Sequence, residues 1–482
     1  MFEKRTKSIF IDGKWKDVDS QKTVTVYNPA TLERLTDVAY GGASETKSAI
    51  EAASTAFPVW SEMTGRERSR ILYKAAELMT EDADRLGEIL TLEQGKPLKE
   101  AVGEVKGAAG FLLWYAEEAS RGYGEWIPSS TKSKRLLVVP RPVGVIGAIT
   151  PWNFPASMIT RKLGPALAAG CTAVLKPAPE TPLSAIEIVK IFAKAGMPNG
   201  VVNLVTGDAQ AIGNEMLTNK DVRLITFTGS TAVGKYLMRE SSEHVKKLSL
   251  ELGGHAPSIV FDDADIDKAT TLVLGSKFRN NGQTCICTNR LYVHESIADA
   301  FTSMLKDKVA QMQIGSGLGE EVELGPLINE KALEKVQAHL DDAVKNGAKV
   351  VYGGSQWEGN LDGHFYQPTI LSGATDNMLI MNEETFGPII PVQTFTDEDE
   401  ALRKANDTDY GLAAYIFTEN TNRAIRASEK LEYGIVGVND VFPSVPEAPF
   451  GGIKQSGVGK EGGHHGMDEF LEKKFISVGL DG

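Results

Sequence analysis

GVIGAIT, at residues 144–150, is a short apolar stretch that begins a regular alternation of strand-like and helix-like segments. A second apolar stretch, TAVLK at 172–176, follows a helical pattern at 159–169. Strands buried in a parallel sheet form continuous apolar runs of this length, and two such strands need a helix to connect them. Further strands of the series are expected at 201–206, 224–228 and 247–251. The series predicts a doubly wound parallel α/β sheet, on which ligands collect at the carboxyl ends of the strands.

A second alternating series follows the glycine pair Gly253-Gly254 and predicts a second doubly wound α/β domain. The first third of the chain shows mainly helical patterns, the first of which Ser44 can cap. We interpret this third as helical cover without chemistry of its own.

Composition excludes several classes of partner. The chain has 482 residues and a formal net charge of −13, so we expect neither nucleic acid nor an anionic membrane as a partner. Residues 1–7 contain no apolar segment, so we expect no signal peptide, and no apolar run reaches the length of a membrane span. Three cysteines do not form a disulfide framework, which favours a cytoplasmic protein.

Two of the three cysteines lie in the polar stretch FRNNGQTCIC at 278–287. Cys171, in contrast, lies inside an apolar run and is typical of a packed thiol. A nucleophilic cysteine needs thiolate character, which a helix N-terminus or a nearby cation supplies. Cys285 is therefore a candidate nucleophile.

Two other residues could complete such a site. Asn153 stands in PWNFP at 151–155, directly after a buried strand, and its amide could donate to an oxyanion. Glu251 ends the strand at 247–251 and could act as a general base. Locally, a rigid aromatic turn explains PWNFP equally well, and a solvated glutamate is the favoured interpretation of Glu251.

Glycine-rich loops give weaker signals. The sequence GVGKEG at 457–462 matches a dinucleotide fingerprint but follows no strand, so we interpret it as an ordinary loop. The loop GSTAVGKY at 229–236 follows a strand and opens a helix, which suits phosphate binding at the helix N-terminus. It fails as an ATPase P-loop because Tyr236 replaces the magnesium-binding hydroxyl residue. Lys176 ends a strand, where a cation suits a ribose or a phosphate, although a solvated lysine is the commoner case.

A metal site is not expected. Cys285 and Cys287 have no second cysteine pair, and His464-His465 have no ligand partners at a suitable spacing.

Together these motifs resemble the NAD(P)-dependent aldehyde dehydrogenase superfamily along essentially the whole chain. The glutamate and the cysteine are 34 positions apart, which is the interval of that family. The motifs that carry the resemblance are PWNFP at 151–155, KP at 176–177, FTGS at 227–230, LELGG at 250–254, GQTC at 282–285, ETFGP at 384–388 and PFGG at 449–452.

The resemblance implies a mechanism and a coenzyme site. Cys285 would attack the aldehyde, the Asn153 amide and the Cys285 backbone N–H would stabilise the oxyanion, and Glu251 would activate water to hydrolyse the thioester. Lys162 and Glu461 match a proton-relay pair of the family. The coenzyme contacts implied are Trp152, Lys176, Pro179, Gly229, Ser230, Glu384 and Phe386.

Within the family, the sequence resembles the succinate-semialdehyde dehydrogenases. Arg161, Arg279 and Ser444 fall where those enzymes hold the substrate carboxylate, and Phe450 is a further substrate contact. Two guanidinium groups suit an anionic tail in an acidic protein. Glutarate semialdehyde, another ω-carboxylated aldehyde or a neutral aldehyde stays an alternative substrate.

Further expectations also rest on the resemblance. Pro179, where relatives that prefer NAD often carry glutamate, favours NADP, with NAD as the alternative. Cys287 would close a disulfide with Cys285 under oxidation. The expected parts are a coenzyme-binding domain (1–120 and 142–252), a catalytic domain (253–455) and an oligomerisation and bridging element (121–141 and 456–482), which would form a homodimer or homotetramer.

Overall fold

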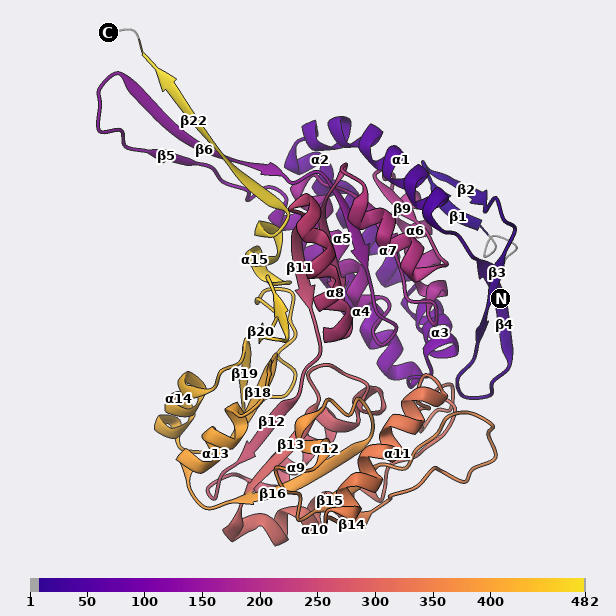
Figure 1. The fold of residues 1–482 in the computed structure, drawn as a ribbon, viewed down its shortest axis with the longest axis vertical. Helices are drawn as coiled ribbons and strands as arrows, with labels where there is room; N and C mark the ends of the chain where they lie inside the picture. Colours follow the sequence, from indigo (N-terminus) through magenta and orange to yellow (C-terminus); the bar gives the residue numbers. More distant parts are fainter. Residues whose placement is uncertain (1–7, 481–482) are drawn as a thin grey trace.

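Two parallel β-sheets form the centres of two lobes, which Figure 1 shows as the indigo-to-magenta upper part and the orange lower part. The computed structural model describes residues 8–480, so residues 1–7, where we expect no signal peptide, lie outside the described part. Helices surround both sheets, and the α/β fold predicted from the alternating pattern is confirmed. Within residues 8–480, no helix is long and apolar enough to cross a bilayer.

The first sheet has eight strands in the order β2-β1-β9-β8-β7-β10-β11-β21. Antiparallel strands close its two edges: β2 (Lys14–Asp17) with β1 (Ser8–Ile11) at one, and β21 (Gly457–Val458) at the other. The centre is parallel and follows the predicted series; β8 is buried along its whole length, which explains its continuous apolar run. The central strands are β7 (Val145–Ile149), β8 (Thr172–Lys176), β9 (Val202–Leu204), β10 (Val222–Thr228) and β11 (Lys247–Glu251).

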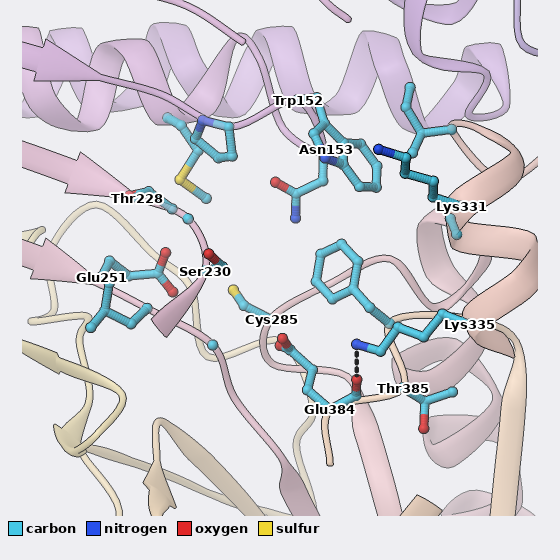
Figure 2. Close-up of a pocket in the computed structure, with 18 of the residues that line it drawn as sticks. Trp152, Asn153, Thr228, Ser230, Glu251, Cys285, Lys331, Lys335, Glu384 and Thr385 are labelled. Carbon is cyan, nitrogen blue, oxygen red and sulfur yellow. Dashed lines mark hydrogen bonds between the residues drawn. The ribbon is translucent and has the colours of Figure 1, made fainter. Parts of the chain in front are cut away.

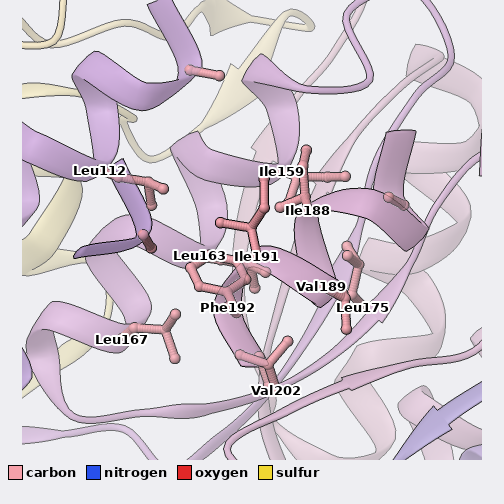
Figure 3. Packing of buried hydrophobic residues seen from close by; sticks show 14 of the residues in the cluster. Leu112, Ile159, Leu163, Leu167, Leu175, Ile188, Val189, Ile191, Phe192 and Val202 are labelled. Carbon is pink, nitrogen blue, oxygen red and sulfur yellow. The ribbon is translucent and has the colours of Figure 1, made fainter. Parts of the chain in front are cut away.

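Helices from the first half of the chain cover this sheet. Figure 3 shows part of the resulting core, in which Leu112, Ile159, Phe192 and Val202 meet from three helices and a strand. Close packing of this kind fixes the positions of the strand ends. The helices are α1 (Ala43–Glu62), α2 (Gly65–Glu81), α3 (Ala83–Gln94), α4 (Leu98–Glu118), α5 (Ser157–Ala169), α6 (Pro182–Lys194), α7 (Ala209–Thr218) and α8 (Thr231–Ser241).

The prediction that Ser44 caps the first helix was wrong. The helix begins at Ala43, so Ser44 lies within its first turn and Gly42 is the N-cap. Glu45 accepts a hydrogen bond from the Gly42 N–H at 2.8 Å and closes the helix end without a capping hydroxyl.

The second sheet has seven strands in the order β14-β15-β16-β13-β12-β18-β19, all parallel except for β14. The crossing between the lobes is the short segment from β11 to β12, which contains the predicted glycine pair. The strands are β12 (Ala256–Val260), β13 (Thr288–His294), β14 (Lys349–Tyr352), β15 (Thr369–Ser372), β16 (Ile389–Phe395), β18 (Ala413–Phe417) and β19 (Ile435–Val438). The helices are α9 (Ile266–Phe278), α10 (Ala298–Val309), α11 (Glu330–Lys345), α12 (Leu379–Asn382), α13 (Glu398–Asn406) and α14 (Thr421–Lys430).

A three-stranded arm projects from the upper lobe (Figure 1). It consists of β5 (Glu125–Ile127), β6 (Lys134–Pro142) and β22 (Leu471–Gly479), in the order β22-β6-β5. Its strands expose large apolar side chains, including Phe475 at 60% and Trp126 at 64%. The short helix α15 (Gly463–Asp468) leads from the lobes into β22.

The remaining elements are short. They are β3 (Thr23–Tyr27), β4 (Arg34–Ala39), β17 (Tyr410–Gly411), β20 (Ile453–Lys454) and the 3₁₀ turns Ser242–His244, Arg279–Gly282 and Glu295–Ile297. The segment before GVGKEG, which we expected to hold no strand, thus contains the two-residue β20. This does not make the loop a dinucleotide fingerprint, because two residues separate β20 from the first glycine, β21 occupies the first two residues of the motif, and the six-residue α15 begins only after its last glycine.

Candidate active site

The carboxyl ends of four neighbouring strands carry polar residues of the site. In the order β8-β7-β10-β11, Lys176 ends the first strand, Asn153 follows the second, and Thr228 and Glu251 end the third and fourth. Thr228 and Glu251 are direct neighbours in the parallel register. This is the edge at which doubly wound sheets bind ligands, as the sequence predicts.

The loop that carries Cys285 comes from the other lobe, between α9 and β13. Its backbone is left-handed at Asn280 (φ 49°), Asn281 (φ 55°) and Gly282 (φ 72°), a conformation that asparagine and glycine tolerate best. These residues turn the chain sharply before Cys285, whose side chain is 9% exposed. The stretch NNG at 280–282 therefore shapes the loop that presents the thiol.

Cys285, Asn153 and Glu251 line one cavity of about 330 Å³ (Figure 2). In Figure 2 the Asn153 amide and the Cys285 sulfur point into the same space, and Glu251 enters it from the side. Asn153 follows β7, Glu251 ends β11, and Cys285 lies in the loop before β13. Only the fold brings the three residues together. Other residues of the lining include Trp152, Thr228, Gly229, Ser230, Lys331, Lys335, Glu384 and Phe386.

The Asn153 side chain has one donor to spare. Its Nδ2 donates to the Gln283 carbonyl at 3.0 Å, and an amide nitrogen carries two hydrogens. The side chain is 5% exposed, so the remaining N–H is directed by the protein and not by solvent. Such a group can stabilise an oxyanion next to Cys285.

Burial sets the proton affinities of the thiol and the carboxylate. It raises the pKa of Cys285 well above the usual value for a thiol, and the charge of Glu251 raises it further. Neither a helix N-terminus nor a cation makes this thiol a resting thiolate, contrary to the expectation for a nucleophile. Burial, together with the charge of Glu461, raises the pKa of Glu251 to about 7. A base of this strength can take a proton from a thiol or from water at neutral pH.

The predicted pair Lys162–Glu461 is present, with Arg161 as a third member. Lys162 Nζ lies 2.5 Å from Glu461 Oε1 and donates to Thr228 Oγ1 at 2.6 Å. Arg161 Nε lies 2.9 Å from Glu461 Oε2. Although burial opposes the charge of Glu461, the two cations hold its pKa below the usual value. The positive charges of Arg161 and Lys162 also reach Glu251 and limit the rise of its pKa.

Arg161 keeps free donor capacity in a buried position. The residue is 3% exposed, its guanidinium lies 3.8 Å above the Phe450 ring, and its Nη1 is 3.5 Å from Ser444 Oγ. Among the described residues, its Nη2 has no hydrogen-bond partner. A buried N–H of this kind favours an acceptor from a ligand, and an anionic acceptor most of all.

Arg279 stands apart from this group. It is half-buried, and its guanidinium lies 5.1 Å from the centre of the Phe154 ring. Within residues 8–480, no hydrogen bond joins it to Arg161 or Ser444. Of the expected carboxylate clamp, the structure thus brings Arg161 and Ser444 into contact, whereas Arg279 lies beside Phe154.

Five of the expected coenzyme residues, Trp152, Gly229, Ser230, Glu384 and Phe386, line the same cavity. Gly229 and Ser230 lead into α8, where the Ser230 hydroxyl caps the helix, and a Cβ on Gly229 would lie 2.5 Å from the Phe227 ring. Trp152 and Phe386 meet edge to face at 5.6 Å, and Phe386 has the unusual φ of 54°. A helix N-terminus beside paired aromatic rings in one cavity fits a dinucleotide, with the pyrophosphate at the helix end.

Glu384 is held by the glycine pair between the lobes. Its Oε1 accepts the Gly254 N–H at 2.9 Å, and burial raises its pKa to about 6. A Cβ at Gly254 would lie 2.2 Å from the Cys285 carbonyl oxygen, so only glycine fits between the two. The LELGG motif thus sets the distance between the glutamate strand and the cysteine loop.

Lys176 and Pro179 lie outside the first cavity. Lys176 is 5% exposed and donates to the Pro177 carbonyl at 3.1 Å, while Pro179 and Glu180 line a second cavity. Burial lowers the pKa of Lys176, and the charge of Glu180 opposes that effect. Ile328 and Asn329 line both cavities, which are therefore neighbours.

Cys287 has surroundings different from those of Cys285. It is 1% exposed, and its thiol lies within hydrogen-bonding distance of the Gly282 carbonyl (3.4 Å), Asn289 Oδ1 (3.5 Å) and Lys277 Nζ (3.9 Å). All three cysteines are free in the structure. Among residues 8–480, no group of three or more metal-binding side chains occurs.

Sequence reasoning missed four residues of the site region. The first third of the chain, interpreted as cover without chemistry, supplies Lys96 and Glu104, which bind the segment around Asn153. Helix α11 supplies Lys331 and Lys335, which line the cavity, and Lys335 donates to the Glu384 carbonyl at 2.5 Å (Figure 2). The EK pattern of α11 is typical of a solvated helix face, and no local signal distinguishes the two exposed lysines that line the cavity.

The two glycine loops have structural roles. Tyr236, the residue that excludes a P-loop, donates to Asn214 on α7 at 2.8 Å. In GVGKEG, Gly457 pairs with Glu251 in the sheet, while Glu461 exchanges two backbone hydrogen bonds with Phe450. Glu461, the expected relay residue, thus lies in this loop, and Gly457 allows close approach to β11, since a Cβ there would lie 2.3 Å from the Leu250 carbonyl oxygen.

Comparison with known proteins identifies the family of the chain. A family model described as the aldehyde dehydrogenase family matches residues 15–476. The succinate-semialdehyde dehydrogenase (NADP+) of Escherichia coli strain K12 is 51% identical over 470 residues, which cover 98% of this chain and 97% of that protein. The glutarate-semialdehyde dehydrogenase of Pseudomonas aeruginosa is also 51% identical over 470 residues, with the same coverage. The crystal structure of succinate-semialdehyde dehydrogenase from Burkholderia pseudomallei superposes with a TM-score of 0.97 at 49% identity and covers 98% of both chains.

Proposed function

Since the chain belongs to the aldehyde dehydrogenase family, we propose that it oxidises succinate semialdehyde to succinate with NADP as the hydride acceptor. Relatives with half of their residues identical are named for succinate semialdehyde and NADP, or for glutarate semialdehyde. The observation that carries the substrate proposal is the buried guanidinium of Arg161, whose Nη2 lacks a partner among the described residues. The carboxylate of an ω-carboxylated aldehyde supplies that partner, with Ser444 as a second donor and Phe450 as the packing surface.

The proposed first step forms a bond between Cys285 and the aldehyde. The Cys285 proton passes to Glu251, whose pKa of about 7 suits this transfer, and the sulfur attacks the carbonyl carbon. The resulting oxyanion accepts hydrogen bonds from the free N–H of Asn153 Nδ2 and from the Cys285 backbone N–H. Bound in this cavity, NADP would supply the hydride acceptor for this carbon.

The second step releases the acid. Glu251 first passes on the proton that it took from Cys285 and so returns to its carboxylate form. A water molecule then attacks the thioester on Cys285, its proton passes to Glu251, and the Cys285 sulfur leaves as a thiolate. We propose that Lys162 and Glu461, 2.5 Å apart, carry this proton onward from the base. Burial of all three groups excludes bulk water from the route.

For the coenzyme we propose contacts along one side of the cavity. Gly229 and Ser230 at the start of α8 would hold the pyrophosphate, with Trp152 on the adenosine side, while Glu384 would bind the nicotinamide ribose and Phe386 would pack near that end. Lys176 would meet the adenosine ribose. Pro179 carries no negative charge that would repel the 2′-phosphate of NADP, which favours NADP. The carboxylate of the neighbouring Glu180 weakens this preference, so NAD stays the alternative coenzyme.

Three wider proposals follow from the same family membership. Residues 1–120 with 142–252 would form the coenzyme-binding domain and 253–455 the catalytic domain, while 121–141 and 456–482 would link subunits into a homodimer or homotetramer. We place the protein in the cytoplasm, where its three free cysteines would stay reduced.

Cys287 is proposed to close a disulfide with Cys285 under peroxide. The bond would cost Cys287 its contacts with Gly282 and Asn289. Inactivation by peroxide that dithiothreitol reverses, and that becomes irreversible in Cys287→Ala, would support the proposal. Identical, irreversible inactivation of both proteins would contradict it.

A panel of substrates tests the proposed function. kcat/KM is measured with NADP and with NAD for succinate semialdehyde, glutarate semialdehyde and butanal, which lacks the carboxylate. We expect succinate semialdehyde with NADP to give the highest value and butanal to lose about 10- to 100-fold, the worth of a charge-assisted hydrogen bond. A higher value for glutarate semialdehyde would move the assignment to the longer acid, and equal values for butanal would refute the carboxylate clamp.

A further inference from the structure

Lys96 is a fully buried lysine in the loop between α3 and α4, more than fifty positions before Asn153 in the sequence. Its side chain is 0% exposed, and its Nζ donates to the Asn153 carbonyl at 2.7 Å. The ammonium also lies 3.8 Å above the centre of the Phe154 ring. The lysine therefore contacts the main chain of the residue whose side chain is proposed to bind the oxyanion.

Glu104 pairs with Lys96 and extends the contact. Its Oε2 lies 2.6 Å from Lys96 Nζ, and its side chain is 1% exposed. Its other oxygen accepts the backbone N–H groups of Ala156 at 2.9 Å and Ser157 at 3.1 Å, at the start of α5. The buried pair thus fixes the segment PWNFP at both sides of Phe154.

Asn280 brings the cysteine loop into the same network. Its Nδ2 lies within hydrogen-bonding distance of both the Asn153 carbonyl and the Gln283 carbonyl, each at 3.1 Å. The Gln283 carbonyl also accepts the Asn153 side chain at 3.0 Å. Gln94, two residues before Lys96, donates to Asn280 Oδ1 at 2.9 Å. The end of α3 and the loop after it therefore contact both the segment that contains Asn153, through Lys96, and the loop that presents Cys285, through Gln94.

We propose that Lys96 is a positioning residue for the dehydrogenase reaction, acting with Glu104 through the Asn153 main chain. The proposal rests on the oxyanion role proposed above for Asn153. With the main chain fixed by Lys96 and Asn280, one Asn153 N–H is held by Gln283 and the other is left to donate to the oxygen of the carbonyl group that Cys285 attacks. A donor displaced by a fraction of an ångström loses much of its effect, because preorganised hydrogen bonds act only at the right distance.

A purely structural role predicts a different result. A buried ion pair stabilises little by itself, and its removal as a pair is tolerated when hydrophobic or neutral groups of similar size replace it. If Lys96 and Glu104 only filled space, their neutral replacements would change the melting temperature. Any effect of these replacements on kcat would then be the same whether residue 153 is asparagine or alanine.

The test is a cycle of variants. Lys96→Met combined with Glu104→Gln removes both charges at once, so neither is left alone in the core, and the glutamine oxygen can still accept from α5. The same pair of changes is made in the wild type and in Asn153→Ala, and kcat and KM for succinate semialdehyde are measured in all four proteins. Lys246→Met is the matched control, because Lys246 also donates to two backbone carbonyls, at 2.6 Å each, away from the site.

We expect the paired change to lower kcat by about 10- to 100-fold in the wild type, with KM changed less than about 3-fold. In the Asn153→Ala background the same change should lower kcat by less than about 3-fold, because the group that Lys96 positions is gone. The control should leave kcat unchanged.

Equal losses in both backgrounds, or no loss in the wild type, would overturn the positioning role while leaving the proposed function intact. A wild-type kcat in Asn153→Ala would instead refute the oxyanion role and the present proposal together. If the paired variant does not fold, Gln94→Met serves, since it removes the donor to Asn280 without burying a charge. It should lower kcat about 3- to 10-fold in the wild type only, and equal losses in both backgrounds would again overturn the proposal.

Discussion

Burial raises the pKa of Glu251 to about 7, while Lys162 and Arg161 keep the pKa of the equally buried Glu461 low. The two carboxyl groups thus differ because of their neighbours, and only Glu251 is poised to exchange protons near neutrality. Among the described residues, its carboxylate oxygens have no hydrogen-bond partner, which leaves them free for a thiol or a water molecule. The structure thus favours Glu251 as the base.

The pH dependence of kcat tests this assignment. The base works as a carboxylate, so a group with a pKa raised to about 7 is active above that pH and loses activity as the pH falls through it. We expect kcat to rise with a midpoint near pH 7 in the wild type and to be low and flat in Glu251→Gln. Glu461→Gln removes a neighbouring negative charge and should move the midpoint down; an upward shift would contradict the electrostatic account.

Arg279 gives the cleaner test of the substrate clamp. Arg161 also acts on Glu251 and Glu461, so its removal changes the base as well as the binding of the substrate. For Arg279→Ala we expect KM for succinate semialdehyde to rise about 10- to 100-fold, with KM for butanal nearly unchanged, because one charge-assisted bond is lost. Equal rises for both substrates in steady-state kinetics would remove Arg279 from the clamp.

Some of these residues could be predicted and others could not. Cys285, Glu251 and Asn153 stand in motifs at strand ends or on a polar loop, where local sequence indicates a site. Lys96 follows a helix end and precedes a proline, a context in which a lysine is usually solvated. Its burial depends on packing of α3 and α4 against a loop distant in sequence, so the contact appears only in the fold.

At the scale of elements, five-residue strands buried on both faces were predictable because a parallel sheet requires continuous apolar runs. The first helix cap was not, since Glu45 takes the place of a capping hydroxyl. The turn NNG at 280–282 could not be predicted either. Asparagine and glycine tolerate a left-handed backbone, but their presence does not reveal that three successive residues adopt it; the φ angles of the structure do. Element type was thus readable from sequence, whereas caps and turns needed the structure.

The turn before β11 contains a strained residue. Val245 adopts a left-handed backbone (φ 50°) although it is β-branched and 90% exposed. Val245→Asn should raise the free energy of unfolding by about 1 kcal/mol, because asparagine tolerates this conformation. Chemical denaturation checks this, with Val344→Asn on α11 as the control at ordinary helical angles, where no gain is expected. An equal gain at both positions would show that strain is not the cause.

At the scale of the whole molecule, the site lies where the upper sheet's strand ends face the loops of the lower lobe (Figure 1). The glycine pair and Glu384 join the lobes next to Cys285, so the relative position of the lobes sets the distance between base and nucleophile. The motifs indicated the two sheets and their functions, but the sequence has no local signal for the way the lobes meet.

The arm β5-β6-β22 tests the proposed assembly. Phe475→Asp replaces an apolar side chain of β22 that is 60% exposed by a charged one, and a charge buried without a partner in an interface disfavours association. We expect a smaller sedimentation coefficient than for the wild type with unchanged helix content, and Lys474→Asp as the charge control should dissociate less. A wild-type coefficient in Phe475→Asp would exclude this strand from the interface.

Trapping of the acyl-enzyme tests the central claim most directly. Glu251→Gln lacks the base of both steps, but it also lacks the charge that raises the pKa of the Cys285 thiol further, so at alkaline pH the thiolate can still attack. The thioester should then form but hydrolyse slowly, and incubation with NADP and succinate semialdehyde should leave a succinyl group on the protein. Intact mass and peptide mapping should place that group on Cys285, with one NADPH released per subunit, and Cys285→Ala should show neither. An unmodified Cys285, or an acyl group on another residue, would contradict the account.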